Sequence, residues 1–323
     1  MLKKTLIASI VLAVASTSAL AKELTTAKFL FDVGPYGNHS WVLKGIKDRT
    51  FEKYGINLVP IGVGPGSVKT GMALAAGKAD VGYQDFSGVI TVNGKYKTPG
   101  LKAIFVVDDR AQDGVYTLKS SGIKTWDDLD GRTVGSFPTG TTRNLIPVIT
   151  TAKPSYVNMP FALRVPSLVS GKVDASEGFL TTMKFNLIKS GHPDFITLQV
   201  ADKLPYAISR VITVSNAWAA ANPEAVDKLR KAVKELLVEH IDDPEASVRA
   251  LKGPLTMGAK GMSIEIERAK FNNAVLIMTD RVKKHGLNNS SVLAPRLDKY
   301  IDVLSEKLRL PNKHAYYEYY DLD

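Results

Sequence analysis

The 323-residue chain contains no cysteine. This absence excludes disulfides, thiolate metal ligands and cysteine nucleophiles, so an apolar core must hold the fold together. Other chemical signatures are missing too. The five histidines are scattered without His-x-x-x-His or His-Glu pairs, and neither a Gly-x-Ser-x-Gly elbow nor a Gly-Lys-Ser/Thr phosphate loop occurs. We therefore expect no metal, no cofactor and no catalytic residues, and we expect that the protein is not an enzyme.

Long hydrophobic runs are also lacking, apart from one near the N-terminus. Lys3-Lys4 precedes an apolar run from Leu6 to Ala15, and Ala19-Leu20-Ala21 follows it. A charged segment, an apolar segment and a small-x-small site form an export signal, and the run is too short to span a membrane. We expect a signal peptide at residues 1–21 that is cleaved after Ala21. An uncleaved anchor is the alternative.

Acidic residues are too few to balance the basic ones. The chain has 42 Lys and Arg against 32 Asp and Glu, a net charge of +10, which falls to +8 (40 against 32) once Lys3 and Lys4 leave with the signal. The basic residues are spread along the chain and often adjoin acids, as in Lys47-Asp48-Arg49. This pattern is typical of solvated surface, and we expect no nucleic-acid partner.

One short phrase occurs twice, 94 residues apart. Leu74 to Asp80 reads Leu-Ala-Ala-Gly-Lys-Ala-Asp, and Leu168 to Asp174 reads Leu-Val-Ser-Gly-Lys-Val-Asp. Each copy predicts a helix that ends at Gly, a tight turn and a short strand. Unless the match is chance, it indicates one α/β unit in each of two lobes. Because ligands bind beyond the carboxyl ends of strands, Gln84-Asp85-Phe86 and Glu177-Gly178-Phe179 should face one cleft.

Strands and helices are predicted to alternate along most of the chain, which favours mainly parallel sheets. A strand at Val211 to Ser215 should return the chain to the first lobe, and the pattern from Pro223 onward is helical. We expect lobe one at residues 22–118 plus 212–323 and lobe two at 119–211. The two short crossings between them would form a hinge.

Four stretches, at residues 37–56, 71–83, 123–134 and 171–179, resemble the NMT1/THI5-like group of solute-binding proteins of ABC importers. The group includes sulfonate, nitrate and thiamine-precursor receptors. The resemblance implies an α/β, two-lobed periplasmic-binding-protein fold of type II. Each lobe would be a mixed sheet flanked by helices, joined by a two-strand hinge. Asp48-Arg49-Thr50-Phe51 departs from the group's Gly-Tyr-Phe signature and leaves the subfamily open.

The resemblance also implies a function. The protein would be a periplasmic receptor that captures a small organic solute between two lobes and delivers it to an ABC permease in the inner membrane. Contact with the permease would be transient, and the receptor would be a monomer. One alternative is a receptor that serves another transporter or a sensor kinase. The other is an enzyme like the thiamine-precursor synthases on the same fold, although their cysteine-rich iron motif is missing here.

Candidate ligand-binding residues follow the predicted strands. The loop after the strand that begins at Thr133 is rich in Gly, Ser and Thr, and it opens a helix whose N–H groups suit an anionic oxygen. An ordinary helix cap is the alternative. Aromatic residues could stack on a planar ligand, carboxylates could accept its N–H groups, and two loop residues are placed at the cleft by the family resemblance. The candidates are Asn38, His39, Gly66, Ser67, Asp85, Phe86, Phe137, Thr139, Gly140, Thr141, Thr142, Glu177 and Phe179.

We expect the ligand to be a small planar or aromatic compound with an anionic group, and a neutral aminopyrimidine is the rival. The anionic group would bind at the loop from Ser136 to Thr142, because a helix start combines unsatisfied N–H donors with a partial positive charge.

Overall fold

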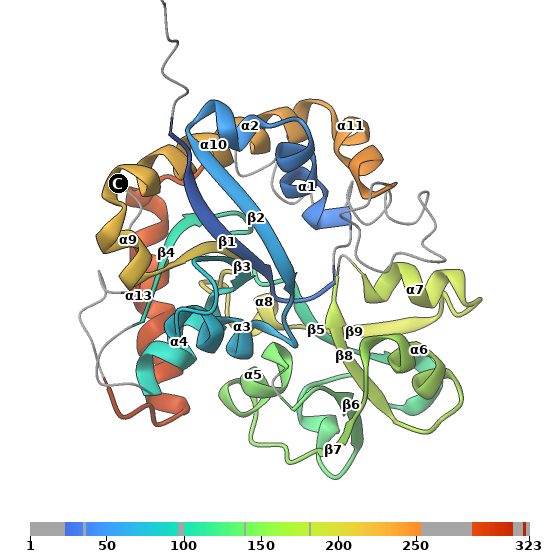
Figure 1. Ribbon diagram of the computed structural model, residues 1–323. Coiled ribbons are helices and arrows are strands. Elements are labelled where there is room, and N and C mark those ends of the chain that lie inside the picture. The colour runs from blue at the N-terminus through green and yellow to red at the C-terminus, as the bar shows by residue number, and fades with distance from the viewer. Residues whose placement is uncertain are drawn as a thin grey trace, which may run out of the picture.

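The computed structural model describes residues 23–34, 37–95, 100–138, 140–180, 182–252, 286–312 and 319–320. The predicted signal peptide and Thr139 lie outside these residues. Two five-stranded sheets, each covered by helices, form two lobes (Figure 1). The expected pair of mixed sheets flanked by helices is confirmed.

The two sheets share one topology. The first contains β1 (Thr25–Phe31), β2 (Ile56–Val63), β3 (Val81–Asp85), β4 (Leu101–Val106) and β10 (Arg210–Ser215) in the order β2-β1-β3-β10-β4. The second contains β5 (Asp113–Leu118), β6 (Thr133–Ser136), β7 (Ser155–Asn158), β8 (Ala175–Phe179) and β9 (Phe195–Gln199) in the order β7-β6-β8-β5-β9. In each sheet only the fourth strand in this order runs antiparallel to its neighbours. That strand is the one that follows the crossing from the other lobe.

The first crossing lies earlier in the chain than the sequence analysis placed it. β5 pairs with β8 and β9, so it belongs to the second lobe, and the chain crosses at residues 107–112 and not after residue 118. The second crossing, at residues 200–209, contains α8 (Val200–Lys203). The sequence of an apolar strand does not predict which sheet the strand joins, because its partner strands depend on tertiary packing.

Helices cover both faces of both sheets. On the first sheet, α1, α2, α10 and α11 pack on one face and α3, α4 and α13 on the other. On the second sheet, α5 and α8 share one face and α6 and α7 the other. The helices, with the short 3-10 turns η1 to η4, are α1 (Ser40–Lys47), α2 (Thr50–Lys53), α3 (Ser67–Ala75), α4 (Phe86–Lys95), α5 (Thr141–Ile149), α6 (Phe161–Val169), α7 (Met183–Lys189), α9 (Asn216–Ala221), α10 (Pro223–Asp242), α11 (Pro244–Arg249), α13 (Ser290–Lys307), η1 (Gly37–His39), η2 (Lys119–Ser121), η3 (Asp127–Leu129) and η4 (Ala250–Lys252).

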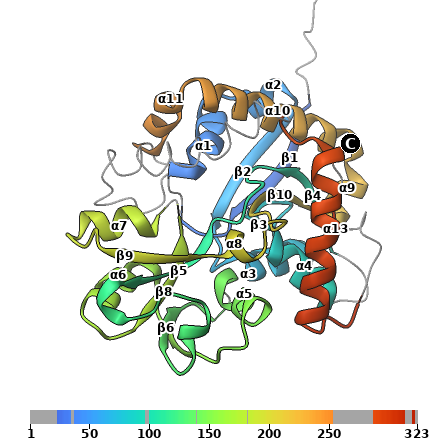
Figure 2. The ribbon, with the colours of Figure 1, turned by 180° about the vertical axis from the view of Figure 1, so that it is seen from behind.

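Helix α13 touches both lobes near the hinge. It contacts α4 in the first lobe and α5 in the second, and it runs along one side of the molecule in Figure 2. Its Arg296 donates to the Asp109 carboxylate at 3.2 Å and to the Pro205 carbonyl at 3.3 Å. Asp109 lies in the first crossing and Pro205 in the second. One guanidinium therefore holds the two crossings together.

The repeated phrase has the same structure in both lobes. Gly77 and Gly171 have φ of +69° and +72°, in the left-handed region that glycine tolerates. The Gly77 N–H donates to the Leu74 carbonyl and the Gly171 N–H donates to the Leu168 carbonyl, each in the last turn of the preceding helix. The following strands, β3 and β8, hold equivalent places in their sheets. The repeat is structural and not a chance match.

The last residue of each repeated phrase, Asp80 or Asp174, accepts a backbone hydrogen bond from a neighbouring strand. The Asp80 carboxylate accepts the Lys28 N–H of β1 at 2.8 Å, and the Asp174 carboxylate accepts the Thr133 N–H of β6 at 2.7 Å. The hydrogen bonds from Thr133 also hold the pKa of Asp174 below its usual value. Each aspartate therefore holds its turn against the strand next to the central one, β1 in the first sheet and β6 in the second.

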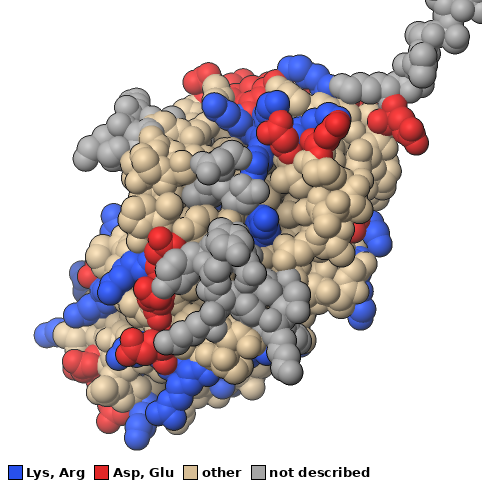
Figure 3. All heavy atoms as spheres, turned by 90° about the vertical axis from the view of Figure 1, so that its left-hand side faces the viewer, with Lys and Arg blue, Asp and Glu red and all other residues tan. Residues whose placement is uncertain are grey.

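The charged surface is mixed. On the face shown in Figure 3, lysine and arginine side chains are interspersed with acidic ones. Among the described residues, no helix combines the length and the apolar character that a membrane span requires.

We predict that Asp80→Ala and Asp174→Ala each lower the free energy of unfolding by at least about 1 kcal/mol, the usual loss for one hydrogen bond, since Asp80 accepts the Lys28 N–H and Asp174 accepts both the N–H and the hydroxyl of Thr133. Urea denaturation would measure both. Asp194→Ala is the control, because Asp194 is an exposed partner of Lys119 and should change stability by less than about 0.5 kcal/mol. Equal effects of all three substitutions would contradict the structural role of the repeated aspartates.

Candidate functional site

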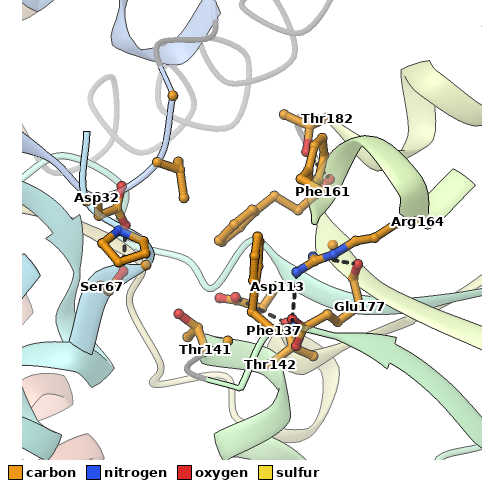
Figure 4. A pocket seen from close by; sticks show the side chains of 18 of the residues that line it. Asp32, Ser67, Asp113, Phe137, Thr141, Thr142, Phe161, Arg164, Glu177 and Thr182 are labelled. Carbon is orange, nitrogen blue, oxygen red and sulfur yellow. Dashed lines mark hydrogen bonds and ion pairs between the residues drawn. The ribbon is translucent and has the colours of Figure 1, made fainter. Parts of the chain in front are cut away.

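A cavity of about 160 Å³ lies between the two sheets. Its walls are the loops at the carboxyl ends of parallel strands in both lobes, together with the first residues of the antiparallel strands β5 and β10. Figure 4 shows Asp32 and Ser67 on one side of it and the second-lobe side chains on the other. The lining residues are Asp32, Val33, Gly34, Asn38, Gly64, Pro65, Gly66, Ser67, Asp113, Phe137, Gly140, Thr141, Thr142, Phe161, Arg164, Glu177, Gly178, Phe179, Thr182 and Arg210.

The wall from the second lobe is organised by Glu177 of β8. Its side chain is 2% exposed, and its carboxylate accepts the N–H groups of Phe137 and Arg143, at 2.9 and 3.0 Å. Both donors flank the start of α5, where the helix dipole favours negative charge. A Cβ at Gly140 would lie 2.2 Å from Glu177 Oε1, so the carboxylate rests directly on the glycine backbone. The protein's own carboxylate thus occupies this helix start.

Arg164 of α6 neutralises Glu177. Its Nη2 donates to Glu177 Oε1 at 2.9 Å, and its Nη1 donates to the Glu177 carbonyl at 3.0 Å. The guanidinium also lies 4.7 Å from the Phe137 ring centre and 5.4 Å from that of Phe161. Both charged side chains are at least 96% buried. A buried pair with this many bonds is rigid, and loss of one partner leaves an uncompensated charge.

The wall from the first lobe contains a second buried pair. The Asp32 carboxylate, at the end of β1, accepts from Ser67 and from Arg210 through the same oxygen, Oδ2. Its other oxygen, Oδ1, has no partner among the described residues. Arg210 lies 4.6 Å from the ring centre of Phe179 in the second lobe. Arg210 therefore links the two walls of the cavity.

Two further buried carboxyl groups lie near Arg210. Burial, together with the charges of Asp85 and Glu177, raises the pKa of Asp113 well above its usual value. Asp113 accepts only a 3.3 Å hydrogen bond from Thr142 and forms no ion pair with a described residue. Burial likewise raises the pKa of Asp85 to about 6, although Ser87, Ser209 and the charge of Arg210 oppose this shift.

The structure brings most of the sequence-predicted residues together but not all. Asn38, Gly66, Ser67, Phe137, Gly140, Thr141, Thr142, Glu177 and Phe179 line the cavity. His39, Asp85 and Phe86 do not line it, and Thr139 lies outside the described residues.

The three candidates that lie away from the cavity have structural contacts. His39 packs edge-on against the rings of Phe31 and Tyr83. Phe86 belongs to the apolar core, and Asp85 accepts from the hydroxyls of Ser87 and Ser209 behind the cavity wall. Many residues at strand ends line the cavity, but a side chain at a strand end can also point into the lobe.

Four charged lining residues were missed by the sequence analysis: Asp32, Asp113, Arg164 and Arg210. Asp32 ends the first strand, so the rule that ligands bind beyond strand ends could have found it. Arg164 interrupts an otherwise apolar helix, which is also a usable signal. Asp113 and Arg210 are the first residues of β5 and β10, the strands that follow the crossings, and only the tertiary structure places both at the cavity.

Two sheets of this topology, joined by two crossings around a central cavity, define the periplasmic-binding-protein fold. Similar solved structures include the alkanesulfonate-binding protein SsuA of Xanthomonas axonopodis pv. citri bound to MOPS, with a TM-score of 0.65, 12% identity, and 90% of this chain and 96% of that chain covered. The periplasmic aliphatic sulphonate binding protein SsuA of Escherichia coli has a TM-score of 0.64, 15% identity and 91% of each chain covered. The periplasmic nitrate-binding protein NrtA of Synechocystis PCC 6803 has a TM-score of 0.58, 14% identity and 89% of each chain covered.

The family follows from the sequence comparison. The model of the family described as NMT1/THI5 like matches residues 38–247, which is 210 of the 323 residues. The chain therefore belongs to the NMT1/THI5-like family. No match was found among curated proteins.

We predict that the effect of Asp85→Asn on stability depends on pH. Since the pKa of Asp85 rises from 3.8 to about 6 in the folded protein, the folded state binds more protons than the unfolded chain between these values. The contribution of Asp85 to stability therefore falls as pH rises from about 4 to about 6. The asparagine variant lacks this loss. Its free energy of unfolding, relative to that of the wild type, should increase from pH 4 to pH 7 in urea titrations.

Asp194→Asn supplies the control for this experiment, because Asp194 is 80% exposed in an ion pair with Lys119. A difference between Asp85→Asn and wild type that is the same at every pH would show that Asp85 is not an acid of raised pKa.

Proposed function

We propose that the protein is an extracytoplasmic receptor that captures a small organic solute between its two lobes and delivers it to an ABC importer. The observation that carries this proposal is the cavity, to which both lobes contribute strand-end loops and which two crossings connect. A ligand in such a cavity would contact both walls at once. Its binding would therefore favour the closed arrangement of the lobes over the open one.

The comparisons support this role. Solved structures with the same fold include proteins named for binding alkanesulfonate and nitrate, and one from Staphylococcus aureus named as the ligand-binding component of an ABC-type import system. The expected export signal would place the mature receptor, a monomer cleaved after Ala21, in the periplasm, where it would meet the permease transiently. We propose a binding role without catalysis.

The contacts that cross the hinge support closure as a defined movement. Arg210 belongs to the first lobe and lies against Phe179 of the second, while Arg296 holds the two crossings together. Because the crossings are tied to each other, the lobes can rotate about them but cannot easily separate. We propose that this rotation opens and closes the cavity.

We predict that the freshly purified protein retains a small molecule, and that Gly34→Trp abolishes its retention. Gly34 lines the cavity, and a Cβ added there meets no atom within 4 Å, so the indole can fill the cavity without a clash at the backbone. Native mass spectrometry would detect the bound mass. Ala220→Trp is the control, because it adds the same side chain to an exposed position of α9.

X-ray scattering and thermal unfolding would complete the test. A ligand at about 100 times its dissociation constant should compact the wild-type protein and stabilise it by about 2.7 kcal/mol. Ligand loss by both tryptophan variants, or stabilisation of the wild type without compaction, would contradict capture between the lobes.

A further inference from the structure

The cavity is lined by more carboxyl groups than guanidinium groups. Three carboxyl groups and two guanidinium groups line it, and each of the five residues is at least 97% buried. Arg164 is paired with Glu177, and Arg210 is paired with Asp32. Asp113 is left without an ion pair among the described residues. Both cations of the cavity thus already have an ion-pair partner, whereas Asp113, on which the charge of Arg210 acts without an ion pair, lines the same cavity.

The helix start that would otherwise receive an anion is occupied. Glu177 accepts the N–H groups of Phe137 and Arg143 and the guanidinium of Arg164, all at 3.0 Å or less. A ligand carboxylate or sulfonate at this place would have to displace Glu177 or lie against its negative charge. In a buried site either outcome is costly.

The opposite wall, from the first lobe, contains two side-chain acceptors that lack a donor. Asp32 and Asn38 line the cavity, and their Oδ1 atoms are buried and have no hydrogen-bond partner among the described residues. Buried acceptors normally have a donor, so a molecule in the cavity should supply one. Asp113 lies on the other wall of the cavity. These groups together favour a ligand that carries N–H or O–H groups and positive charge.

The size and the apolar lining limit the ligand further. A cavity of about 150 Å³ accommodates a benzene-sized molecule, and this one measures about 160 Å³. Phe137, Phe161 and Phe179 supply aromatic faces to it. These faces suit a flat ring, and they attract a cation more than an anion.

We propose that the solute is a compact organic nitrogen base, with a protonated or N–H-rich nitrogen at Asp113 and a further donor at Asp32, and that Glu177 excludes organic anions from the cavity. This inference rests on the proposed receptor function and gives it a ligand class. Burial and the charges of Asp85 and Glu177 raise the pKa of Asp113, and a cation bound beside it would lower that pKa by stabilising the carboxylate. The anionic ligand that the helix start alone suggested is thereby replaced.

Three compounds of one shape test the charge preference in the full-length mature protein. Benzamidine is a cation, benzamide is neutral and benzoate is an anion, and calorimetry would measure each at pH 7. We expect benzamidine to bind at least 10-fold more tightly than benzoate. Asp113→Asn should weaken benzamidine by about 10- to 100-fold, the range for a hydrogen bond to a charged group, and should change benzamide by less than about 3-fold.

The Glu177→Gln variant tests whether Glu177 excludes anions, because its loss of charge should increase the affinity for anionic ligands. The variant keeps the size of the side chain but leaves Arg164 and the start of α5 without a negative charge, so benzoate and ethanesulfonate should bind at least 10-fold more tightly than to the wild type. Glu224→Gln is the control, because Glu224 is 86% exposed on α10, where it pairs with Lys228. Circular dichroism and thermal melts would establish that each variant folds.

The outcomes separate this inference from the receptor function. Wild-type protein that binds benzoate or ethanesulfonate as tightly as benzamidine would overturn the ligand class while supporting capture of a solute. Failure of all three ring compounds to bind wild type would overturn the ligand class too, and the mass-spectrometric test of a retained solute would still decide the function. If Glu177→Gln does not fold, Gly140→Ala tests the same point, because its Cβ would displace the Glu177 carboxylate from the helix start. Unchanged anion affinity in the folded variants would refute the role of Glu177.

Discussion

The buried Glu177 carboxylate is the interaction on which the cavity depends. It joins β8, the start of α5 and α6 through Phe137, Arg143 and Arg164. Each of these groups would be costly to bury alone, because an unpaired charge in a dry site loses its hydration without compensation. Together they form a fixed wall. The same contacts decide the electrostatics of the site, since they use the positive end of the helix before any ligand arrives.

Each wall of the cavity contains a buried ion pair, but the two pairs differ in how fully their carboxylates are hydrogen-bonded. Asp32 and Arg210 form the ion pair there, and Arg210 also reaches Phe179 across the cavity. Asp32 keeps one oxygen unbonded among the described residues, whereas both oxygens of Glu177 are bonded. The two ion pairs thus differ: Glu177 is fully bonded within the protein, and Asp32 retains an unbonded acceptor. Under the proposed function, a ligand between the two walls would favour the closed arrangement of the lobes.

The hinge and the cavity share residues at the starts of β5 and β10. Each antiparallel strand enters its sheet directly from a crossing, so β5 and β10 begin at the cavity, and their first residues, Asp113 and Arg210, line it. Movement at the crossings must shift these two side chains relative to each other. Helix α13 limits that movement through Arg296, which bonds to both crossings. In the proposed closure, lobe rotation would therefore move the charged groups that line the cavity.

The sequence by itself determined the two α/β units, because the helix stop at Gly77 and Gly171 and the aspartate after each are local signals that act within a few residues. It also placed Glu177 and the start of α5 at strand ends. Only the tertiary structure decided that β5 belongs to the second sheet and that Glu177 bonds Phe137, Arg143 and Arg164 within the protein. Strand partners and the direction of a buried side chain depend on packing between segments far apart in the chain, and no local pattern records that packing.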